Sequence, residues 1–200
     1  MFNFYLKGGS KMDKKVFDKI LETIKNDDIK EYAKKCIDTI PDYFYDVPAS
    51  SSGKYHPAYT VTKHGLVKHT FAACAIFNHI MSLDCFNFDF TKREQELMLV
   101  AIIMHDSRKC GSQIDYELEN GTTFVHPLLA ATVVRRVEGL CEDEREIVAK
   151  AIETHMGQWT TSKYSDVVLP EIDVNNKFQK IVHLADFLAS RKDIQVDVEI

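Results

Sequence analysis

The sequence predicts an all-α fold, a single-domain bundle of about seven helices with little or no β structure. Apolar residues recur at helical spacing along most of the chain, and no segment alternates apolar and polar residues long enough to predict a long strand. Only residues 124–125 and 194–200 could form short strands. With 200 residues, of which 45% are hydrophobic, the chain suffices for one full-sized domain and is too short for two joined by a linker.

Two amphipathic helices are predicted near the N-terminus. The first covers residues 13–26, and the second runs from about Asp28 to Pro41, because proline cannot continue a helix. From Pro41 to Thr62 the periodicity disappears, and repeated Pro, Ser and Gly indicate an irregular loop. Such a loop is long for a compact domain, which suggests a functional role.

Five further helices are predicted after this loop. Their signals are apolar periodicity, the capping-box pair Thr91 and Glu94, Pro127 in a first turn, and Gly157 after a last turn. They are expected over residues 65–80, 91–105, 127–139, 142–156 and 175–190.

Charge and cysteine content exclude several classes of protein. The formal charge of −5 gives no global attraction for nucleic acid or for an anionic membrane, so an anionic ligand must be captured locally. No apolar run reaches the roughly 18 residues of a spanning helix, and the first residues lack the features of a signal peptide. The odd number of cysteines and their scatter favour free thiols, so we expect a cytoplasmic protein; they are Cys36, Cys74, Cys85, Cys110 and Cys141.

The adjacent residues His105 and Asp106 are the first candidates for a metal site. They fall at the end of a predicted helix, where both side chains can converge on one ion and the carboxylate could bridge two. Alone, such a pair is more often a chance dipeptide. His69 and Asp186, however, lie inside apolar helices, where an imidazole or carboxylate is costly unless it is hydrogen-bonded or bound to a cation.

Two further histidines complete a donor set without thiolates. His126 is expected at a helix start and His155 at a helix end. Imidazole and carboxylate donors suit one or two divalent ions of manganese, iron, cobalt, nickel or magnesium at a hydrolytic site, and do not resemble a structural zinc site.

In this order and context, these residues resemble the HD superfamily of metal-dependent phosphohydrolases. The segments GLVKHT, AIIMHDSRK and HLADFLASR match its three motifs over roughly Gly65 to Arg191. The resemblance implies an HD-type bundle in which His69, His105, Asp106 and Asp186 bind metal. It also implies that His126 and His155 are the extra ligands of the dinuclear branches, where Asp106 would bridge two ions. Residues 63–191 would then be the catalytic core, and residues 1–62 a helical pair and substrate-facing loop of the same compact domain.

The family resemblance also assigns roles to two basic residues. In the family the lysine of the HDxxK segment points at the scissile phosphate, which would make Lys109 catalytic together with Asp106; a solvated lysine after a helix is the alternative reading. Arg108 departs from the family, where a small residue, often glycine, precedes that lysine. This departure leaves the loop conformation open, and we expect Arg108 to contact substrate.

A second basic segment, SSGKYHP over residues 51–57, resembles a loop of a microbial and phage-like subset of the family. Its chemistry suits an anion, because Ser51, Ser52 and Lys54 offer donors and charge and Gly53 lets backbone amides approach. His56 would touch substrate or fix the loop.

The remaining histidines and one aromatic loop receive structural interpretations. His64 and His79 are expected to have no role in the site, whereas His183 shares a helix face with Asp186 and could support it. Trp159, Thr160 and Tyr164 lie in a loop that could stack a base, although aromatic residues in loops more often simply pack against the protein.

The sequence therefore predicts a divalent-metal-dependent phosphohydrolase that cleaves a phosphate ester of a nucleotide or related small molecule with metal-activated water. The alternatives are a 3′–5′ exoribonuclease or cyclic-nucleotide phosphodiesterase, a di-iron oxygenase, and a non-catalytic sensing module. The expected partner is a small phosphorylated substrate, with no membrane and no strong nucleic-acid signal, and a homodimer is left open.

Overall fold

The computed structural model describes residues 12–50, 52–87, 89–111 and 123–197. Within these residues it is helical and has no strand, apart from an isolated bridge between Ser162 and Ser165, so the all-α prediction is confirmed. The described α-helices number eight, one more than expected because of the short α4. They are α1 (Asp18–Leu21), α2 (Asp27–Asp38), α3 (Gly65–Met81), α4 (Asp84–Asn87), α5 (Lys92–Met104), α6 (His126–Arg136), α7 (Glu142–Glu153) and α8 (Lys177–Ala189).

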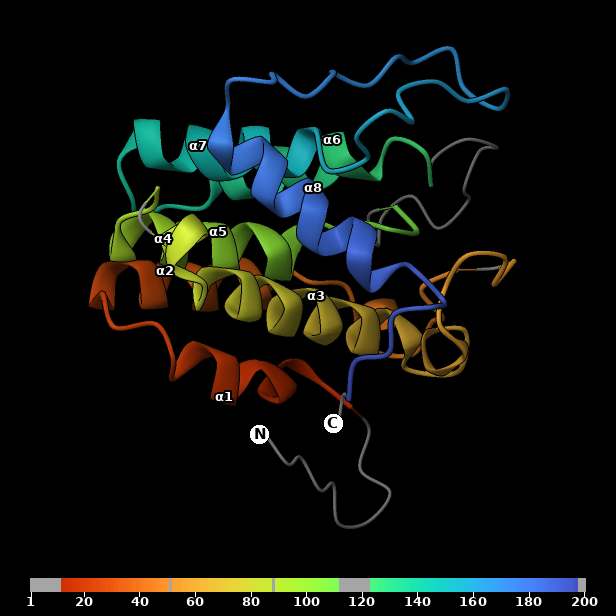
Figure 1. Cartoon of the computed structure of the whole chain (residues 1–200), viewed down its shortest axis with the longest axis horizontal. Helices are drawn as coiled ribbons and strands as arrows, with labels where there is room; N and C mark the ends of the chain where they lie inside the picture. The colour runs from red at the N-terminus through yellow and green to blue at the C-terminus, as the bar shows by residue number, and fades with distance from the viewer. Residues whose placement is uncertain (1–11, 51, 88, 112–122, 198–200) are drawn as a thin grey trace.

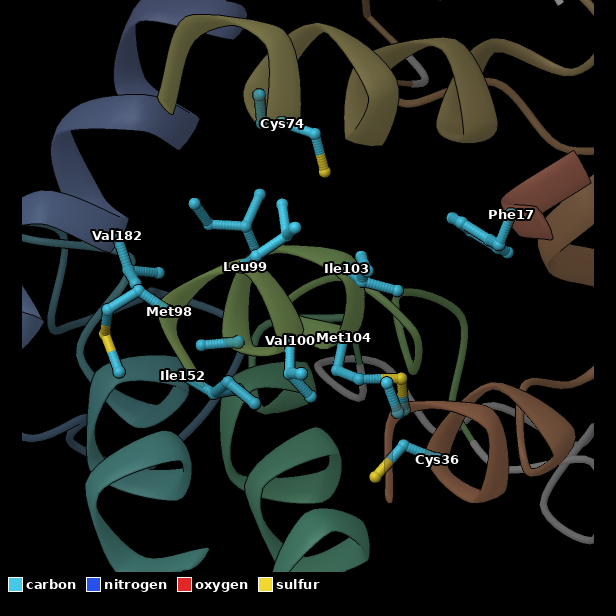
Figure 2. Close-up of a cluster of buried hydrophobic side chains, with 14 of the residues drawn as sticks. Phe17, Cys36, Cys74, Met98, Leu99, Val100, Ile103, Met104, Ile152 and Val182 are labelled. Atoms are coloured by element: carbon cyan, nitrogen blue, oxygen red, sulfur yellow. The ribbon is translucent and has the colours of Figure 1, made fainter. Parts of the chain in front are cut away.

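Helix α5 lies at the centre of the bundle. It runs between α2 and α3 on one side and α6 and α7 on the other, and α8 crosses the bundle obliquely (Figure 1). Every residue from Leu97 to Met104 is buried, as expected for a helical stretch that is apolar on all sides. In Figure 2, Leu99 points toward Cys74 of α3 and Met104 toward Cys36 of α2. The end of α5 is thereby held in the middle of the molecule.

The start of α5 confirms the predicted capping box. The Thr91 hydroxyl accepts a hydrogen bond from the Glu94 amide at 3.2 Å, and the Thr91 amide donates to the Glu94 carboxylate at 2.7 Å. These bonds satisfy two amide groups that an uncapped helix would leave without partners.

The predicted helix over residues 13–26 is too long. A 3₁₀ turn, Lys14–Phe17, leads into the single turn of α1, which ends at Leu21. The backbone amides of Lys25 and Asn26 instead donate to the Glu96 carboxylate of α5, at 2.7 and 3.1 Å. This tertiary contact ends the helical segment early, and the apolar periodicity could not reveal it.

The loop between α2 and α3 folds back on itself and carries two 3₁₀ turns, Asp42–Tyr45 and Ala58–Thr60. The Ala49 amide donates to the Thr60 carbonyl at 2.9 Å, and a Cβ at Gly65 would lie 1.9 Å from that same oxygen. Only glycine therefore permits this approach. The Lys192 amide also donates to the Tyr55 carbonyl at 2.7 Å, which ties the loop to the end of α8.

One hydrophobic core contains residues from both sides of position 62, including Phe17 and Phe44 before it and Phe71 after it. The division of the chain at residue 62 stays a prediction. The predicted short strands do not form at residues 124–125 or 194–197, and residues 198–200 lie outside the described ranges.

All five cysteines are free, as expected. Among the described residues, no helix has both the length and the apolar character needed to cross a bilayer.

Candidate metal centre

The six predicted histidine and aspartate ligands come together at one place in the bundle, although they are spread along the chain. They lie on α3, at the end of α5, at the start of α6, after α7, and on α8; in chain order they are His69, His105, Asp106, His126, His155 and Asp186. Three overlapping groups of three place their candidate ligand atoms within 4.8 Å of one another. Five helices thus contribute to a single cluster.

The Asp106 carboxylate lies between two pairs of imidazoles. Its Oδ1 is 2.8 Å from His126 Nε2 and 3.6 Å from His155 Nε2. Its Oδ2 is 3.6 Å from His105 Nε2 and 3.8 Å from His69 Nε2. Each carboxylate oxygen therefore faces one pair, which is the arrangement that a bridging carboxylate would need.

The Asp186 carboxylate lies beside the pair formed by His69 and His105. Its Oδ1 is 2.9 Å from His69 Nε2 and 3.5 Å from His105 Nε2, and the two Nε2 atoms are 3.3 Å apart. This side of the cluster holds two imidazoles and two carboxylates. On the other side, His126 and His155 share Asp106, and His155 also lies within reach of His105 and Asp186.

Three of the imidazoles are oriented by the backbone of the preceding turn. Nδ1 lies 2.6 Å from the Ile102 carbonyl in His105, 2.5 Å from the Thr123 carbonyl in His126, and 2.7 Å from the Ile152 carbonyl in His155. A carbonyl can only accept, so these contacts place a proton on Nδ1, and the neutral form of each ring then turns the lone pair of Nε2 inward.

A divalent cation fits this set of donors. His126 Nε2 and His155 Nε2 lie 3.1 Å apart, and with both protons on Nδ1 neither nitrogen can donate to the other or to Asp106. Facing lone pairs beside a carboxylate are unfavourable without a positive charge between them. Neutral imidazole and carboxylate are also the donors that such metals bind.

The charge state of the cluster also favours a bound cation. Burial disfavours ionised Asp106, but Lys109, His105 and His126 outweigh it and hold the pKa of that carboxyl well below its usual range. Burial is likewise outweighed at Asp186, by His105 and His69, so its pKa is also well below normal. Burial and Lys109 lower the pKa of His126 to about 4, which keeps this ring neutral. Asp106 and Asp186 in turn outweigh the burial of His105 and raise its pKa, so the two carboxylates draw positive charge from both His105 and Lys109.

The family model of the HD domain matches residues 66–191, which include all six cluster residues. The chain belongs to the HD domain family. No curated protein and no solved structure matches it. The HD match confirms the family resemblance, and it begins after the SSGKYHP loop, whose own resemblance stays a prediction.

Lys109 of the HD segment lies against Asp106. Its Nζ is 3.1 Å from Oδ1 and 3.0 Å from Oδ2, and a quarter of the side chain remains exposed. Burial lowers the pKa of Lys109, but Asp106 and Asp186 outweigh it and raise the pKa. The structure thus places a cation beside the cluster, with part of its side chain at the surface.

The Arg108 side chain is buried against the end of α2. It is 7% exposed, and its guanidinium donates to the Thr39 carbonyl at the end of α2, at 2.7 Å. This structural contact differs from the predicted contact with substrate. Sequence reasoning also missed Tyr43, whose hydroxyl donates to the Gly111 carbonyl at 2.5 Å and accepts from the Cys110 amide at 3.2 Å, fixing the turn after Lys109.

The SSGKYHP loop reaches the cluster through one residue. The His56 ring lies 5.7 Å from the His69 ring, and burial together with His69 lowers the pKa of His56 to about 4. Ser52 and Lys54 are exposed; the Ser52 hydroxyl accepts from the Lys54 amide at 3.4 Å, and the Lys54 ammonium lies over Tyr55. Ser51 lies outside the described residues.

The other histidines have structural surroundings. His64 has a left-handed backbone, with φ of 63°, and its ring Nδ1 pairs with the Tyr45 carbonyl. His79 is exposed. His183 Nδ1 donates to the backbone carbonyl of His155 at 2.7 Å, so this ring supports the segment that carries a cluster histidine.

Proposed function

We propose that this HD protein is a divalent-metal-dependent phosphohydrolase that cleaves a phosphate ester of a nucleotide. The observation that carries the proposal is the Asp106 carboxylate, which lies between two pairs of inward-facing imidazoles. When bound, one or two divalent ions would supply a water of lowered pKa and neutralise phosphate oxygens. Family membership supports metal-dependent hydrolysis, and the nucleotide is our own extension of it.

The cluster residues would divide into two overlapping sets. His69, His105 and Asp186 would hold one ion, and His126 and His155 a second, with one oxygen of Asp106 in each set. The backbone contacts of Nδ1 keep the histidine rings turned inward, so these rings need little reorganisation when an ion binds.

Lys109 would offset charge on the phosphate. Its ammonium is held by both oxygens of Asp106, and a quarter of the side chain is exposed, so it could approach a phosphate oxygen without leaving its partner. A cation fixed beside the transferring group stabilises charge that develops in the transition state.

The overall charge favours a small substrate. A formal charge of −5 supplies no long-range attraction for a polyanion, so affinity must come from the cluster and a few local cations. A mononucleotide carries its phosphate and its base within reach of one site, which fits this local capture.

The test of the proposed function is metal analysis of anaerobically purified protein together with a panel of mononucleotides, cyclic nucleotides and short oligonucleotides. Asp106→Ala should abolish metal retention and turnover, because both halves of the cluster lose their shared carboxylate. The matched control is His79→Ala, which removes an exposed histidine from α3, the helix that carries His69. Full activity in Asp106→Ala would refute the proposal.

The panel also separates the competing functions. Release of inorganic phosphate from mononucleotides supports the proposal, whereas release of mononucleotides from oligomers, or opening of a cyclic ester, would identify a phosphodiesterase. Oxygen consumption by iron-loaded protein would identify an oxygenase. A protein that holds no metal after reconstitution would be a non-catalytic module.

A further inference from the structure

A row of aromatic and cationic side chains joins α8 to the two loops beside the metal centre. We call it the aromatic–cation row, and it consists of Trp159, Phe187, Arg191 and Tyr55. Trp159 stacks on Phe187, with ring centroids 6.0 Å apart and planes inclined by 15°. The Arg191 guanidinium lies 4.4 Å from the centre of the Phe187 ring and 5.4 Å from that of Tyr55. The four side chains therefore form one continuous series.

At its Trp159 end, the row is connected to the metal centre through His183. The His183 ring lies 6.4 Å from Trp159 and donates to the His155 carbonyl at 2.7 Å. Gly157 lies between His155 and Trp159 in the chain. Its φ is 63°, and a Cβ there would come within 2.2 Å of the His183 ring. Glycine at this position is what permits the approach.

At its Tyr55 end, the row is connected to the other half of the centre. Tyr55 immediately precedes His56, whose ring lies 5.7 Å from that of His69. The row therefore runs from the His155 side of the cluster to the His69 side. Along α8, Phe187 directly follows Asp186, so the row and the cluster share a helix.

The row differs from ordinary core packing in its exposure and its charge. Trp159 is 43% exposed and Tyr55 is 53% exposed, so ring surface at both ends faces solvent. Arg191 donates to the Ser190 hydroxyl at 3.0 Å, but its buried Nε has no hydrogen-bond partner among the described residues. Within the same residues, no carboxylate neutralises its charge. A cation held mainly against aromatic rings, beside open ring surface, suits a planar and anionic ligand.

We propose that the aromatic–cation row binds the base of the nucleotide substrate, stacked on Trp159 and the neighbouring rings, while the phosphate lies at the metal centre. This inference rests on the proposed function and adds the binding site for the base. Stacking on aromatic side chains accepts any of the common bases, because each has a π face. We therefore expect broad base tolerance and a strong dependence on the presence of a base.

Trp159 provides a direct test, because it is the only tryptophan in the chain. Intrinsic fluorescence is measured while the intact protein is titrated with adenosine 5′-monophosphate or with ribose 5-phosphate. Saturable quenching by the nucleotide alone is expected, because only the nucleotide carries a ring that can stack on the indole. Absence of quenching by the nucleotide, or equal quenching by both compounds, would overturn the base site.

The titration separates this inference from the proposed function. Hydrolysis of phosphate esters without quenching would leave the phosphohydrolase proposal intact and refute the base site. Quenching without hydrolysis of any ester would support the base site and refute the enzyme proposal.

Substitution of Trp159 measures the contribution of the row. Trp159→Ala should weaken binding of the nucleotide by about 10-fold, within the range for loss of one base–aromatic stack, and leave binding of ribose 5-phosphate unchanged. Trp159→Phe should retain most of the affinity, since it keeps a ring. Dissociation constants from isothermal titration calorimetry give both values.

The matched control is Val168→Ala, which removes a 67% exposed apolar side chain from the same loop but outside the row. It should leave both affinities unchanged. Equal weakening of both ligands in Trp159→Ala, together with a lowered Tm, would show that Trp159 only supports the loop and would overturn the inference.

Discussion

At the scale of single residues, the Asp106 carboxylate determines what the cluster can do. It is buried and ionised, it faces four imidazoles, and Lys109 contacts both of its oxygens. Burying an ionised carboxylate is costly, and positive charge close to Asp106 offsets that cost. Lys109 supplies part of that charge, and a metal ion among the imidazoles would supply the rest.

Substitution of Lys109 should separate phosphate stabilisation from metal binding. Lys109→Met is expected to retain the metal, because no imidazole or carboxylate is removed, and to lower kcat by about 100-fold, as for loss of one transition-state donor. Metal content and steady-state kinetics measure the two effects. Lys150→Met, which removes a 55% exposed lysine of α7, is the control. An unchanged kcat in Lys109→Met would exclude the proposed role.

The site was predictable from the sequence where a polar residue interrupts an apolar helix. His69 and Asp186 stand out in this way, and the HD order supplied their partners. Arg108 could not be placed, because its acceptor, the Thr39 carbonyl, belongs to a helix distant in the sequence. Tyr55 and Arg191 could not be paired for the same reason, so the aromatic–cation row emerged only from the three-dimensional structure.

At the scale of elements, ion pairs connect helices that the core alone would leave less firmly oriented. Arg93 of α5 contacts Asp28 of α2 at 2.6 Å and Glu144 of α7, also at 2.6 Å. Its hydrogen bonds lower the pKa of both carboxyl groups. A contact between elements also explains why the first helix is shorter than predicted. The Glu96 carboxylate of α5 accepts hydrogen bonds from the backbone amides of Lys25 and Asn26, which the apolar periodicity assigns to that helix.

This ion-pair network gives a prediction for acid unfolding. The folded pKa values of Asp28 and Glu144 lie below their ordinary values of 3.8 and 4.5, so the network stabilises the protein above those values. That contribution is lost as the pH falls through the folded pKa values. Arg93→Gln should therefore be less stable than the wild type at pH 7, with the difference shrinking below about pH 4.

Urea denaturation at a series of pH values measures this difference. Arg136→Gln, at the end of α6, is a control that removes a positive charge without touching the network. A stability difference for Arg93→Gln that stays constant from pH 7 to pH 3 would show that the ion pairs contribute nothing and that only packing of the arginine stem matters.

At the scale of the whole molecule, the metal centre is a junction between helices. Its side chains come from α3 and α8 and from the ends of α5, α6 and α7, so an ion held there would connect five elements in addition to their apolar packing and ion pairs. An unfolded chain scatters these ligands over more than half of its length and would bind the ion poorly. Metal binding should therefore stabilise the folded state as a whole.

Removal of the metal should lower the Tm of the entire domain in one transition. A ligand at 100 times its Kd stabilises the folded state by about 2.7 kcal/mol, which for a chain of this size corresponds to roughly 5–11 °C in Tm. Differential scanning calorimetry with and without a chelator measures the shift. Asp106→Ala should show no response to the chelator, because it has lost the shared ligand, whereas His79→Ala should respond as the wild type does. A wild-type Tm that is indifferent to chelator, in protein shown to contain metal beforehand, would mean that the ion does not hold the five helices together.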